Sequence, residues 1–553
     1  MTTPSSTVAS RGTFDYIVVG GGTAGCVLAS RLSEDRGTRV LVLEAGPEDR
    51  SPWIRIPIGF SRLFTDPAAN WCYETVEQAP LGGRRIYLPA GRVIGGSSSI
   101  NGMVYVRGQP RDFDDWARAG ATGWDWRSLH PYFLRFEGRE HGDDREYGAE
   151  GPIGIARMPV HNAMSEAFID AAAATGLPRR RNLNANPEAP GAGYFHVTTR
   201  RGRRSSAASG YLRPARSREG VVVATGATVR RVRFEADRAT GVEWEERGTI
   251  VTADAAREVL LCAGAIGTPK LLQLSGLGPP ELLATLGIPV RVALPGVGTN
   301  LHDHYGVRLI AELVEPLSIN DAFRRRPHRL VGYALAYAFG RSGQLAIGGA
   351  ECGGFACSRP DVERPDVQFH FLPLSSERRG WRFHPFSGIT ANVCVLRPTS
   401  RGRVAARSPD PADAPAIDPN YLDTDADRRT IVDAIRLGRR VFAADPLARR
   451  IRREVLPGAS VVDDDALLGY ARANGSTVFH PVGTCRIGVD ERAVVGPDLR
   501  VRGVRNLRVV DASVMPGIPS GNTCAAVLAI AERAADLVRG RPTAPPAAAE
   551  EHR

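Results

Sequence analysis

The stretch Phe14-Asp15-Tyr16-Ile17-Val18-Val19-Gly20-Gly21-Gly22-Thr23-Ala24-Gly25 decides the fold of this chain. Its first half is apolar and β-branched, which predicts a short buried strand over 14–19. The glycine cluster follows, and 26–33 has the character of a helix. A second predicted strand over 39–43 ends at Glu44, so the chain opens with a complete βαβ unit.

The glycines of this unit predict a dinucleotide site. Gly20, Gly22 and Gly25 follow a strand and open a helix with the spacing G-x-G-x-x-G, and Glu44 lies 19 positions after Gly25. Glycine lets the backbone approach a pyrophosphate closely, and a helix N-terminus offers free N–H groups and a positive dipole end. A carboxylate at the end of the next strand can accept hydrogen bonds from a ribose diol. The spacing alone does not distinguish NAD from FAD.

Size and charge exclude several other classes of protein. The chain has 553 residues, of which 43% are hydrophobic and 24% charged, as in a multi-domain globular protein. The net charge of +11 is carried almost wholly by dispersed arginines, since Lys270 is the only lysine, and this disfavours a nucleic-acid binder. No apolar run approaches bilayer length. Residues 1–12 lack the apolar core of a signal peptide, which predicts a cytoplasmic location.

Later segments supply more elements of the same kind. Strands predicted at 221–224, 228–234, 259–262 and 507–510, with helices at 268–274 and 523–538, bring dinucleotide-type elements from both ends of the chain. Strands predicted at 367–372, 388–396 and 403–406, followed by a helix at 424–443, indicate a second domain. We therefore predict an α/β fold, with a Rossmann-like domain and an α+β domain that contains an antiparallel sheet.

A second glycine-rich motif identifies a family. It runs Gly91-Arg92-Val93-Ile94-Gly95-Gly96-Ser97-Ser98-Ser99-Ile100-Asn101-Gly102-Met103-Val104-Tyr105, and its small residues can form a nest of N–H donors. These 15 positions resemble the first signature of the glucose–methanol–choline (GMC) flavoprotein oxidoreductases. Further resemblances to that family follow in the expected order, at 264–278, 296–304, 480–485, 511–513 and 519–523. The resemblance extends from about residue 14 to 540 and implies FAD as the cofactor.

The resemblance implies a set of FAD-binding residues, position by position. Gly20, Gly22, Thr23, Ala24 and Gly25 would face the pyrophosphate, Glu44 the adenosine ribose, Val229 the adenine, and 101–104 the flavin. The other implied contacts are Ala45, Trp71, Arg92, Val93, Gly96, Ser97, Asn101, Gly102, Met103, Val104, Gly264, Asp511, Ala512 and Thr523. Some members link FAD covalently through a histidine where this chain has Ile100, so we predict non-covalent FAD.

Changes in the sequence pattern along the chain predict the domain boundaries. The FAD-binding domain is expected over 14–312 and the substrate-binding domain over 313–476. Residues 477–540 are expected to return to the FAD-binding domain and the active site. Residues 541–553 are rich in Pro, Ala and Glu, which predicts a disordered tail.

Two residues are candidates for catalysis. Taking hydride from an alcohol requires that the hydroxyl proton be removed, and histidine suits this because its pKa lies near neutrality. His480 resembles the family's catalytic histidine, and Asn522 occupies the family's second catalytic position. An amide cannot take the proton, but it can donate a hydrogen bond to the alcohol oxygen. The implied reaction is oxidation of a primary alcohol to an aldehyde, with hydride transfer to flavin N5 and oxygen or a quinone as final acceptor.

Several neighbouring residues receive other interpretations. His302 and His304 are predicted to be structural, and Phe479 to form a wall of the pocket. Glu351 either faces the substrate cavity, where it would suit a cationic or polar substrate, or has a structural role. The eight cysteines are scattered without the spacing of zinc ligands, so we expect free thiols and no metal.

Alternative functions stay open at this stage. A flavin-containing lyase of the hydroxynitrile lyase type would use the same scaffold without net redox chemistry. A nicotinamide-linked dehydrogenase would not need the motif at 91–105. Fatty-acid photodecarboxylation also occurs on this scaffold, although no motif here favours it. The substrate pocket is expected to come from 313–476, which carries no motif, so aromatic, furfuryl-type and aliphatic alcohols, choline and sugars all stay possible.

Overall fold

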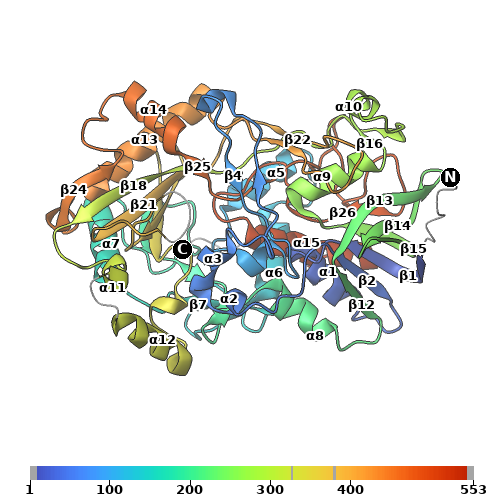
Figure 1. Ribbon diagram of the computed structural model, residues 1–553, viewed down its shortest axis with the longest axis horizontal. Helices are drawn as coiled ribbons and strands as arrows, with labels where there is room; N and C mark the ends of the chain where they lie inside the picture. The colour runs from blue at the N-terminus through green and yellow to red at the C-terminus, as the bar shows by residue number, and fades with distance from the viewer. Residues whose placement is uncertain (1–8, 325–327, 378–381, 545–553) are drawn as a thin grey trace.

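The computed structural model describes residues 9–324, 328–377 and 382–544. It contains two large sheets, which lie toward opposite ends of the molecule in Figure 1. One is mostly parallel and the other antiparallel, so the predicted combination of a Rossmann-like part and an antiparallel sheet is confirmed. The predicted strand at 367–372 and the predicted helices at 268–274 and 424–443 all form, with ends shifted by a few residues at most.

The first sheet is built around the opening βαβ unit. Its strand order is β12-β2-β1-β15-β14-β13, with β26 paired to β15. The strands are β1 (Ala9–Val19), β2 (Val40–Glu44), β12 (Val221–Thr225), β13 (Ala227–Glu235), β14 (Arg238–Glu246), β15 (Thr249–Leu261) and β26 (Leu507–Val509). Strands β12, β2, β1, β15 and β26 run parallel to one another, whereas β14 pairs antiparallel with β15 and β13 pairs antiparallel with β14. The central strands are buried on both faces, as expected for a parallel sheet.

The two ends of the chain meet at this sheet. The first half of β15 pairs with β14, while its last residues pair with β26 from near the C-terminus. Helix α1 (Thr23–Leu32) packs against the C-terminal helix α15 (Cys524–Arg539). The residues just before α15 therefore lie beside the glycine-rich turn, in the region to which the sequence predicts that the C-terminal segment returns.

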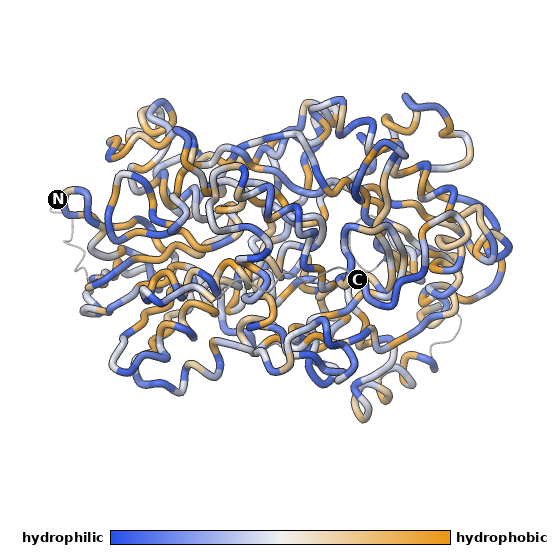
Figure 2. Tube along the Cα trace, turned by 180° about the vertical axis from the view of Figure 1, so that it is seen from behind, coloured by the Kyte–Doolittle hydropathy of each residue, from blue (hydrophilic) through white to orange (hydrophobic). Residues whose placement is uncertain are grey.

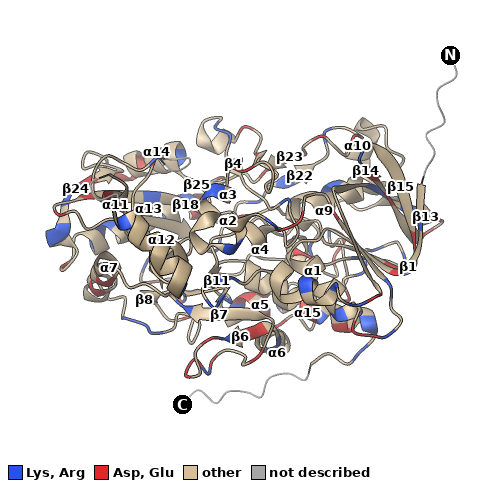
Figure 3. Cartoon of the chain, turned by 60° about the horizontal axis from the view of Figure 1, so that its bottom comes forward, with Lys and Arg blue, Asp and Glu red and all other residues tan. Residues whose placement is uncertain are grey.

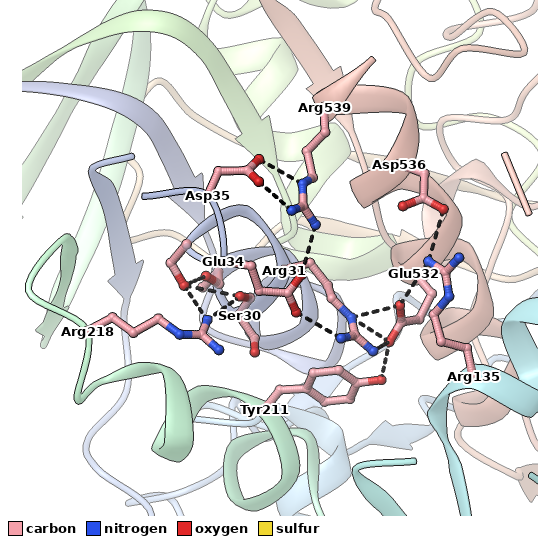
Figure 4. Close-up of polar contacts among 12 residues, drawn as sticks. Ser30, Arg31, Glu34, Asp35, Arg135, Tyr211, Arg218, Glu532, Asp536 and Arg539 are labelled. Atoms are coloured by element: carbon pink, nitrogen blue, oxygen red, sulfur yellow. Dashed lines mark hydrogen bonds and ion pairs between the residues drawn. The ribbon is translucent and has the colours of Figure 1, made fainter. Parts of the chain in front are cut away.

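A buried ion-pair network holds α15 against α1 (Figure 4). The Glu532 carboxylate is fully buried, pairs with Arg31 at 2.8 Å and accepts a hydrogen bond from the Tyr211 hydroxyl at 2.5 Å. Closer to the end of α15, Arg539 makes a two-point contact with Asp35, at 2.8 and 2.6 Å. Glu532 is buried, so removal of its partner Arg31 would leave an uncompensated charge between the two helices.

The second sheet is antiparallel, with strand order β24-β18-β21-β20-β19-β8 and β25 paired to β18. Its strands are β8 (Gly191–Tyr194), β18 (Tyr305–Leu313), β19 (Cys352–Ala356), β20 (Val367–Leu372), β21 (Gly388–Val395), β24 (Ile451–Leu456) and β25 (Ser476–Thr477). One face packs against helix α13 (Asp425–Phe442), through residues such as Leu309, Val393 and Ile435. The opposite face is left to form the wall of a cavity.

The sheets cut across the predicted boundaries in two places. Strand β18 begins at Tyr305, before the expected boundary at 312, and β8 joins the second sheet from within the expected FAD-binding segment. Most of the predicted disordered tail, 545–553, lies outside the described residues.

The distribution of polarity matches this layered arrangement. In Figure 2 many peripheral loops are hydrophilic, while hydrophobic segments run through the interior strands. Figure 3 shows basic and acidic residues interspersed along the chain, and many arginines pair with carboxylates, for example Arg216 with Glu48 at 2.8 Å. Among the described residues, no helix combines the length and hydrophobicity needed to cross a bilayer.

Candidate active site

A cavity of about 620 Å³ runs from the glycine-rich turn to the antiparallel sheet. Its walls come from both ends of the chain and from β18, β20 and β21. Most of the residues that the sequence assigns to FAD lie on it: Gly20, Gly22, Thr23, Ala24, Glu44, Ala45, Trp71, Gly96, Ser97, Asn101, Gly102, Met103, Val104, Val229, Gly264, Asp511, Ala512 and Thr523. His480 and Asn522 line the same cavity, so one continuous space joins the expected cofactor and substrate positions.

Three of the assigned residues do not line the cavity. Gly25 lies behind it, where a β-carbon would stand only 1.9 Å from the carbonyl oxygen of Gly20, so this glycine lets α1 pack on the turn. Val93 is buried in a small apolar cluster. Arg92 places its guanidinium 5.1 Å from the ring centre of Trp71 and so supports a residue that does line the cavity. These three residues support the residues that line the cavity and do not line it themselves.

The glycine-rich turn has the form that a pyrophosphate requires. Gly20 has a positive φ of 103°, and a β-carbon there would lie 2.5 Å from the carbonyl oxygen of Cys262. Within the described structure no side chain caps α1 at Gly22, and the first residues of the helix face the cavity. An uncapped helix N-terminus presents N–H groups and a positive dipole end to a bound anion. The residues present therefore fit the phosphates of a dinucleotide.

Two buried carboxylates organise the loops around this end of the cavity. Glu44 accepts hydrogen bonds from the backbone N–H groups of Gly21 and Gly46, at 2.9 and 2.8 Å. Burial raises the pKa of Glu44 to about 7, although these two bonds favour its charged form. Asp511 accepts from the backbone N–H groups of Gly264 and Ser513, at 2.9 and 2.8 Å. Both carboxylates thus fix turns that line the cavity.

The segment expected along the flavin is held in a tight conformation. Asn101 Oδ1 accepts from the Met103 backbone N–H at 3.1 Å and from the buried Arg204 at 2.6 Å. Gly102 packs so closely on Gly349 that a β-carbon would lie 2.8 Å from the Gly349 Cα. Ile100 lies on the cavity wall with an alkyl side chain, which has no atom able to form a covalent link to a cofactor.

The two predicted catalytic residues are hydrogen-bonded to each other and belong to a row of hydrogen bonds that all run in one direction. Asn522 Nδ2 lies 3.2 Å from His480 Nε2, and His480 Nδ1 lies 3.0 Å from His304 Nδ1. His304 Nε2 is 2.9 Å from the carbonyl oxygen of Leu396. At the other end, Gln368 Nε2 donates to Asn522 Oδ1 at 3.5 Å.

The direction of this chain fixes the tautomer of His480. The Leu396 carbonyl can only accept, so His304 donates through Nε2–H and its Nδ1 carries a lone pair. His480 must then donate through Nδ1–H to His304, which leaves the His480 Nε2 lone pair facing Asn522. Burial keeps these rings neutral: it lowers the pKa of His304 to about 3 and that of His480 well below its ordinary value. The result is an unprotonated base.

The backbone around His480 is held by a third buried carboxylate, that of Asp303. The His480 N–H donates to Asp303 Oδ1 at 2.8 Å, and the Tyr421 hydroxyl donates to Asp303 Oδ2 at 2.6 Å. Thr477 also donates to Asp303. The preceding residue, Phe479, has a positive φ of 71° and lies on the cavity wall, with its ring 5.2 Å from that of Phe64. Its predicted place in the pocket wall agrees with this geometry.

The two histidines that the sequence predicts to be structural have different partners. His302 is buried and donates to the carbonyl oxygen of Asn300 at 2.7 Å, which is a structural contact. His304 instead touches the predicted base. No signal in the sequence separates them, because the two histidines stand two positions apart in the same loop and only the fold decides which one meets His480.

Other cavity residues were not expected from the sequence. Arg308, His370 and Asn392 lie on three adjacent strands of the antiparallel sheet and line the cavity. Glu351, considered as a substrate-facing residue, is fully buried and is not among the lining residues. Its Oε1 accepts a hydrogen bond from the Asn162 backbone N–H at 2.8 Å, so the structure supports the structural alternative.

Comparisons with known proteins place the chain in a family. Models of the N- and C-terminal parts of GMC oxidoreductases match residues 14–306 and 398–531. The chain is 42% identical to the human mitochondrial choline dehydrogenase, over 96% of this chain and 91% of the human protein. It is 40% identical to alcohol dehydrogenase [acceptor] of Pseudomonas putida, over 95% of both chains. The crystal structure of pyridoxine 4-oxidase from Mesorbium loti superposes with a TM-score of 0.86 at 33% identity, over 96% of this chain and all of that one.

The chain therefore belongs to the GMC oxidoreductases, as the sequence motifs predicted. It is an FAD-dependent oxidoreductase that acts on CH–OH groups. The comparisons do not favour the lyase alternative.

Proposed function

We propose that the chain oxidises a primary alcohol to an aldehyde, with His480 as the base and Asn522 as the group that holds the alcohol oxygen. The observation that carries this proposal is the chain of hydrogen bonds that directs the His480 Nε2 lone pair toward Asn522 Nδ2, 3.2 Å away on the cavity wall. An alcohol that approaches this pair from the cavity would replace their mutual hydrogen bond: its hydroxyl would donate its proton to His480 Nε2 and accept a hydrogen bond from Asn522.

His304 acts through His480, as a positioning residue. It accepts the Nδ1–H of His480 at 3.0 Å and so prevents the other tautomer, in which Nε2 would carry a proton. When His480 takes the hydroxyl proton it becomes a cation, and its hydrogen bond to His304 becomes charge-assisted and therefore stronger. The same contact thus prepares the base and stabilises the charge that it acquires.

The cavity walls would hold FAD without a covalent bond. Gly20, Gly22 and the start of α1 would receive the pyrophosphate, and 101–104 would lie along the flavin. When bound, FAD supplies the two-electron oxidant: the alcohol carbon loses a hydride to it while the hydroxyl proton goes to the protein. The protein's own contribution is to hold the alcohol oxygen, accept the proton and keep the reacting groups in place.

Two finer expectations stay predictions. The final electron acceptor is expected to be oxygen or a quinone, and reoxidation of the reduced enzyme by each acceptor decides between them. The cytoplasmic location is likewise a prediction, and the human relative carries a mitochondrial name.

Replacing His480 tests the proposal. The variant His480→Ala is expected to retain bound FAD and to lose most of its anaerobic flavin reduction by an alcohol panel, by roughly 100-fold or more. The matched control is His302→Ala, which removes a buried histidine of the neighbouring loop that makes no described contact with His480. Near-normal flavin reduction in His480→Ala would remove this residue from its role.

A further inference from the structure

The cavity extends past the catalytic pair along one face of the antiparallel sheet. Arg308 on β18 pairs in register with Asn392 on β21, and Asn392 pairs in turn with His370 on β20. All three residues line the cavity. Paired residues on adjacent strands point to the same face of a sheet, so the three side chains form one polar row across it. Gln368, two positions before His370, hydrogen-bonds to Asn522 and ties the catalytic pair to β20.

Arg308 brings a positive charge to this row without a matching carboxylate. Among the described residues no Asp or Glu oxygen forms an ion pair with it. Its Nη1 donates to the carbonyl oxygen of Ser376 at 2.9 Å, and the side chain is partly buried. Burial also lowers the pKa of Arg308, because desolvation disfavours the charged form of the guanidinium. An unpaired, partly buried guanidinium in a cavity wall is suited to bind an anion.

At the end of the cavity near Arg308, the described lining residues include no carboxylate that could pair with a cationic substrate. Of its described lining residues only Glu44 and Asp511 carry carboxylates, and both lie at the glycine-rich end, where backbone N–H groups engage them. Glu351 points away, toward Asn162. A quaternary ammonium alcohol would therefore meet a like charge at Arg308 with no carboxylate beside it to offset the repulsion.

We propose that this chain oxidises alcohols that carry a carboxylate at the end remote from the hydroxyl, with Arg308 binding that carboxylate. The inference rests on the proposed function, because it takes His480 and Asn522 as the place of the hydroxyl. Asn522 hydrogen-bonds to Gln368 of β20, and β20 lies two strands from β18, which carries Arg308, so the two strands are about 10 Å apart. A hydroxy acid with several carbons between its two polar ends spans a gap of this order. Among the described residues, Nη1 of Arg308 makes the hydrogen bonds to the carbonyls of Ser376 and Glu377, which leaves Nη2 and Nε as the donors for such a carboxylate.

A matched set of substrates tests the specificity. Anaerobic flavin reduction is measured with 6-hydroxyhexanoate, 1-hexanol and choline, which differ in the charge remote from the hydroxyl. We expect kcat/KM for the hydroxy acid to exceed that for hexanol by roughly tenfold or more, and choline to be the poorest of the three. In Arg308→Gln the ratio of kcat/KM for the hydroxy acid to that for hexanol should fall by roughly 10- to 100-fold, while kcat/KM for hexanol itself changes by less than about twofold.

Binding provides a readout that does not depend on turnover. Hexanoate has no hydroxyl and cannot be oxidised, so its Kd is followed by the change in flavin absorbance. We expect Arg308→Gln to weaken hexanoate binding roughly 10- to 100-fold, and Arg308→Lys to keep part of it because the charge is retained. Arg218→Gln is the matched control: Arg218 is also partly buried and donates to a carbonyl, that of Ser30, but lies outside the cavity.

The failures of the two proposals are distinguishable. If none of the alcohols reduces the flavin, the proposed function itself fails. If hexanol reduces the flavin but the hydroxy acid has no advantage over it, the specificity proposal is overturned. It is also overturned if Arg308→Gln lowers kcat/KM equally for all substrates and leaves hexanoate binding unchanged, because Arg308 then only supports the Ser376 carbonyl.

Discussion

The contact between His304 and His480 leads to a prediction that separates a positioning role from a purely structural one. His304→Leu places an apolar side chain of similar size in a fully buried position. It removes His304 Nδ1, the atom 3.0 Å from His480 Nδ1 that accepts the hydrogen bond of the His480 Nδ1–H. The proton is then free to move to Nε2, where it would block the base. Any imidazolium formed during the reaction also loses its hydrogen-bond partner.

The size of the effect follows from the energy of this one contact. Leaving a buried donor without its acceptor costs about 1–3 kcal/mol. If the whole of that energy appears in the activation barrier, the rate constant for flavin reduction falls roughly 5- to 150-fold. His304→Asn should recover most of the rate, because the amide oxygen of asparagine can occupy the place of Nδ1 and accept the same hydrogen bond.

The assay is anaerobic stopped-flow bleaching of the flavin with the best alcohol of a panel, at equal FAD content for each variant. His302→Leu is the control, since His302 is equally buried and donates only to the Asn300 carbonyl. We expect this control to reduce its flavin at close to the wild-type rate. An unchanged rate in folded, FAD-containing His304→Leu would refute the reasoning, as would an equal loss in His302→Leu.

Three further predictions concern pH, the cofactor and stability. Because burial places the pKa of His480 well below its ordinary value and the neutral form is the active one, kcat/KM should stay flat as the pH falls to about 6; a half-loss near pH 6.5 in the pH profile would contradict this. Heat or acid denaturation should release all yellow flavin into the supernatant, since Ile100 offers no linking atom, and flavin retained on the pelleted chain would contradict the prediction. Glu532→Ala should lower the free energy of unfolding by about 3 kcal/mol in urea, because Arg31 and Tyr211 lose a buried partner, whereas the more exposed Glu34→Ala should change it by less than about 1 kcal/mol.

The residues of the dinucleotide site could be placed from the sequence because their chemistry is local. Gly20 and Gly22 are required by the turn that they themselves form, and the strand and helix that flank them are encoded in adjacent residues. The strand at 367–372 and the helix at 424–443 were likewise predicted from their own periodicity, and both form. Residues whose task is set by neighbours in the chain carry a signal that can be read without the fold.

The directed hydrogen-bond chain and the substrate wall depended on the tertiary structure. His304 and His480 are 176 positions apart, and His302 looks the same in sequence, so only the path of the loop decides which imidazole meets the base. Arg308 appears in sequence as one more arginine of a basic chain. Its function depends on the register of β18 against β21 and on the absence of an acidic partner among the described residues around it.

The sequence by itself therefore determined the cofactor class and the order of the Rossmann-like elements, and it proposed the catalytic pair, because motifs of neighbouring residues carry these signals. Only the tertiary structure decided which tautomer His480 adopts and which charged side chains line the cavity. Hydrogen-bond direction and electrostatic balance depend on groups that are distant along the chain and meet only when both sheets have assembled.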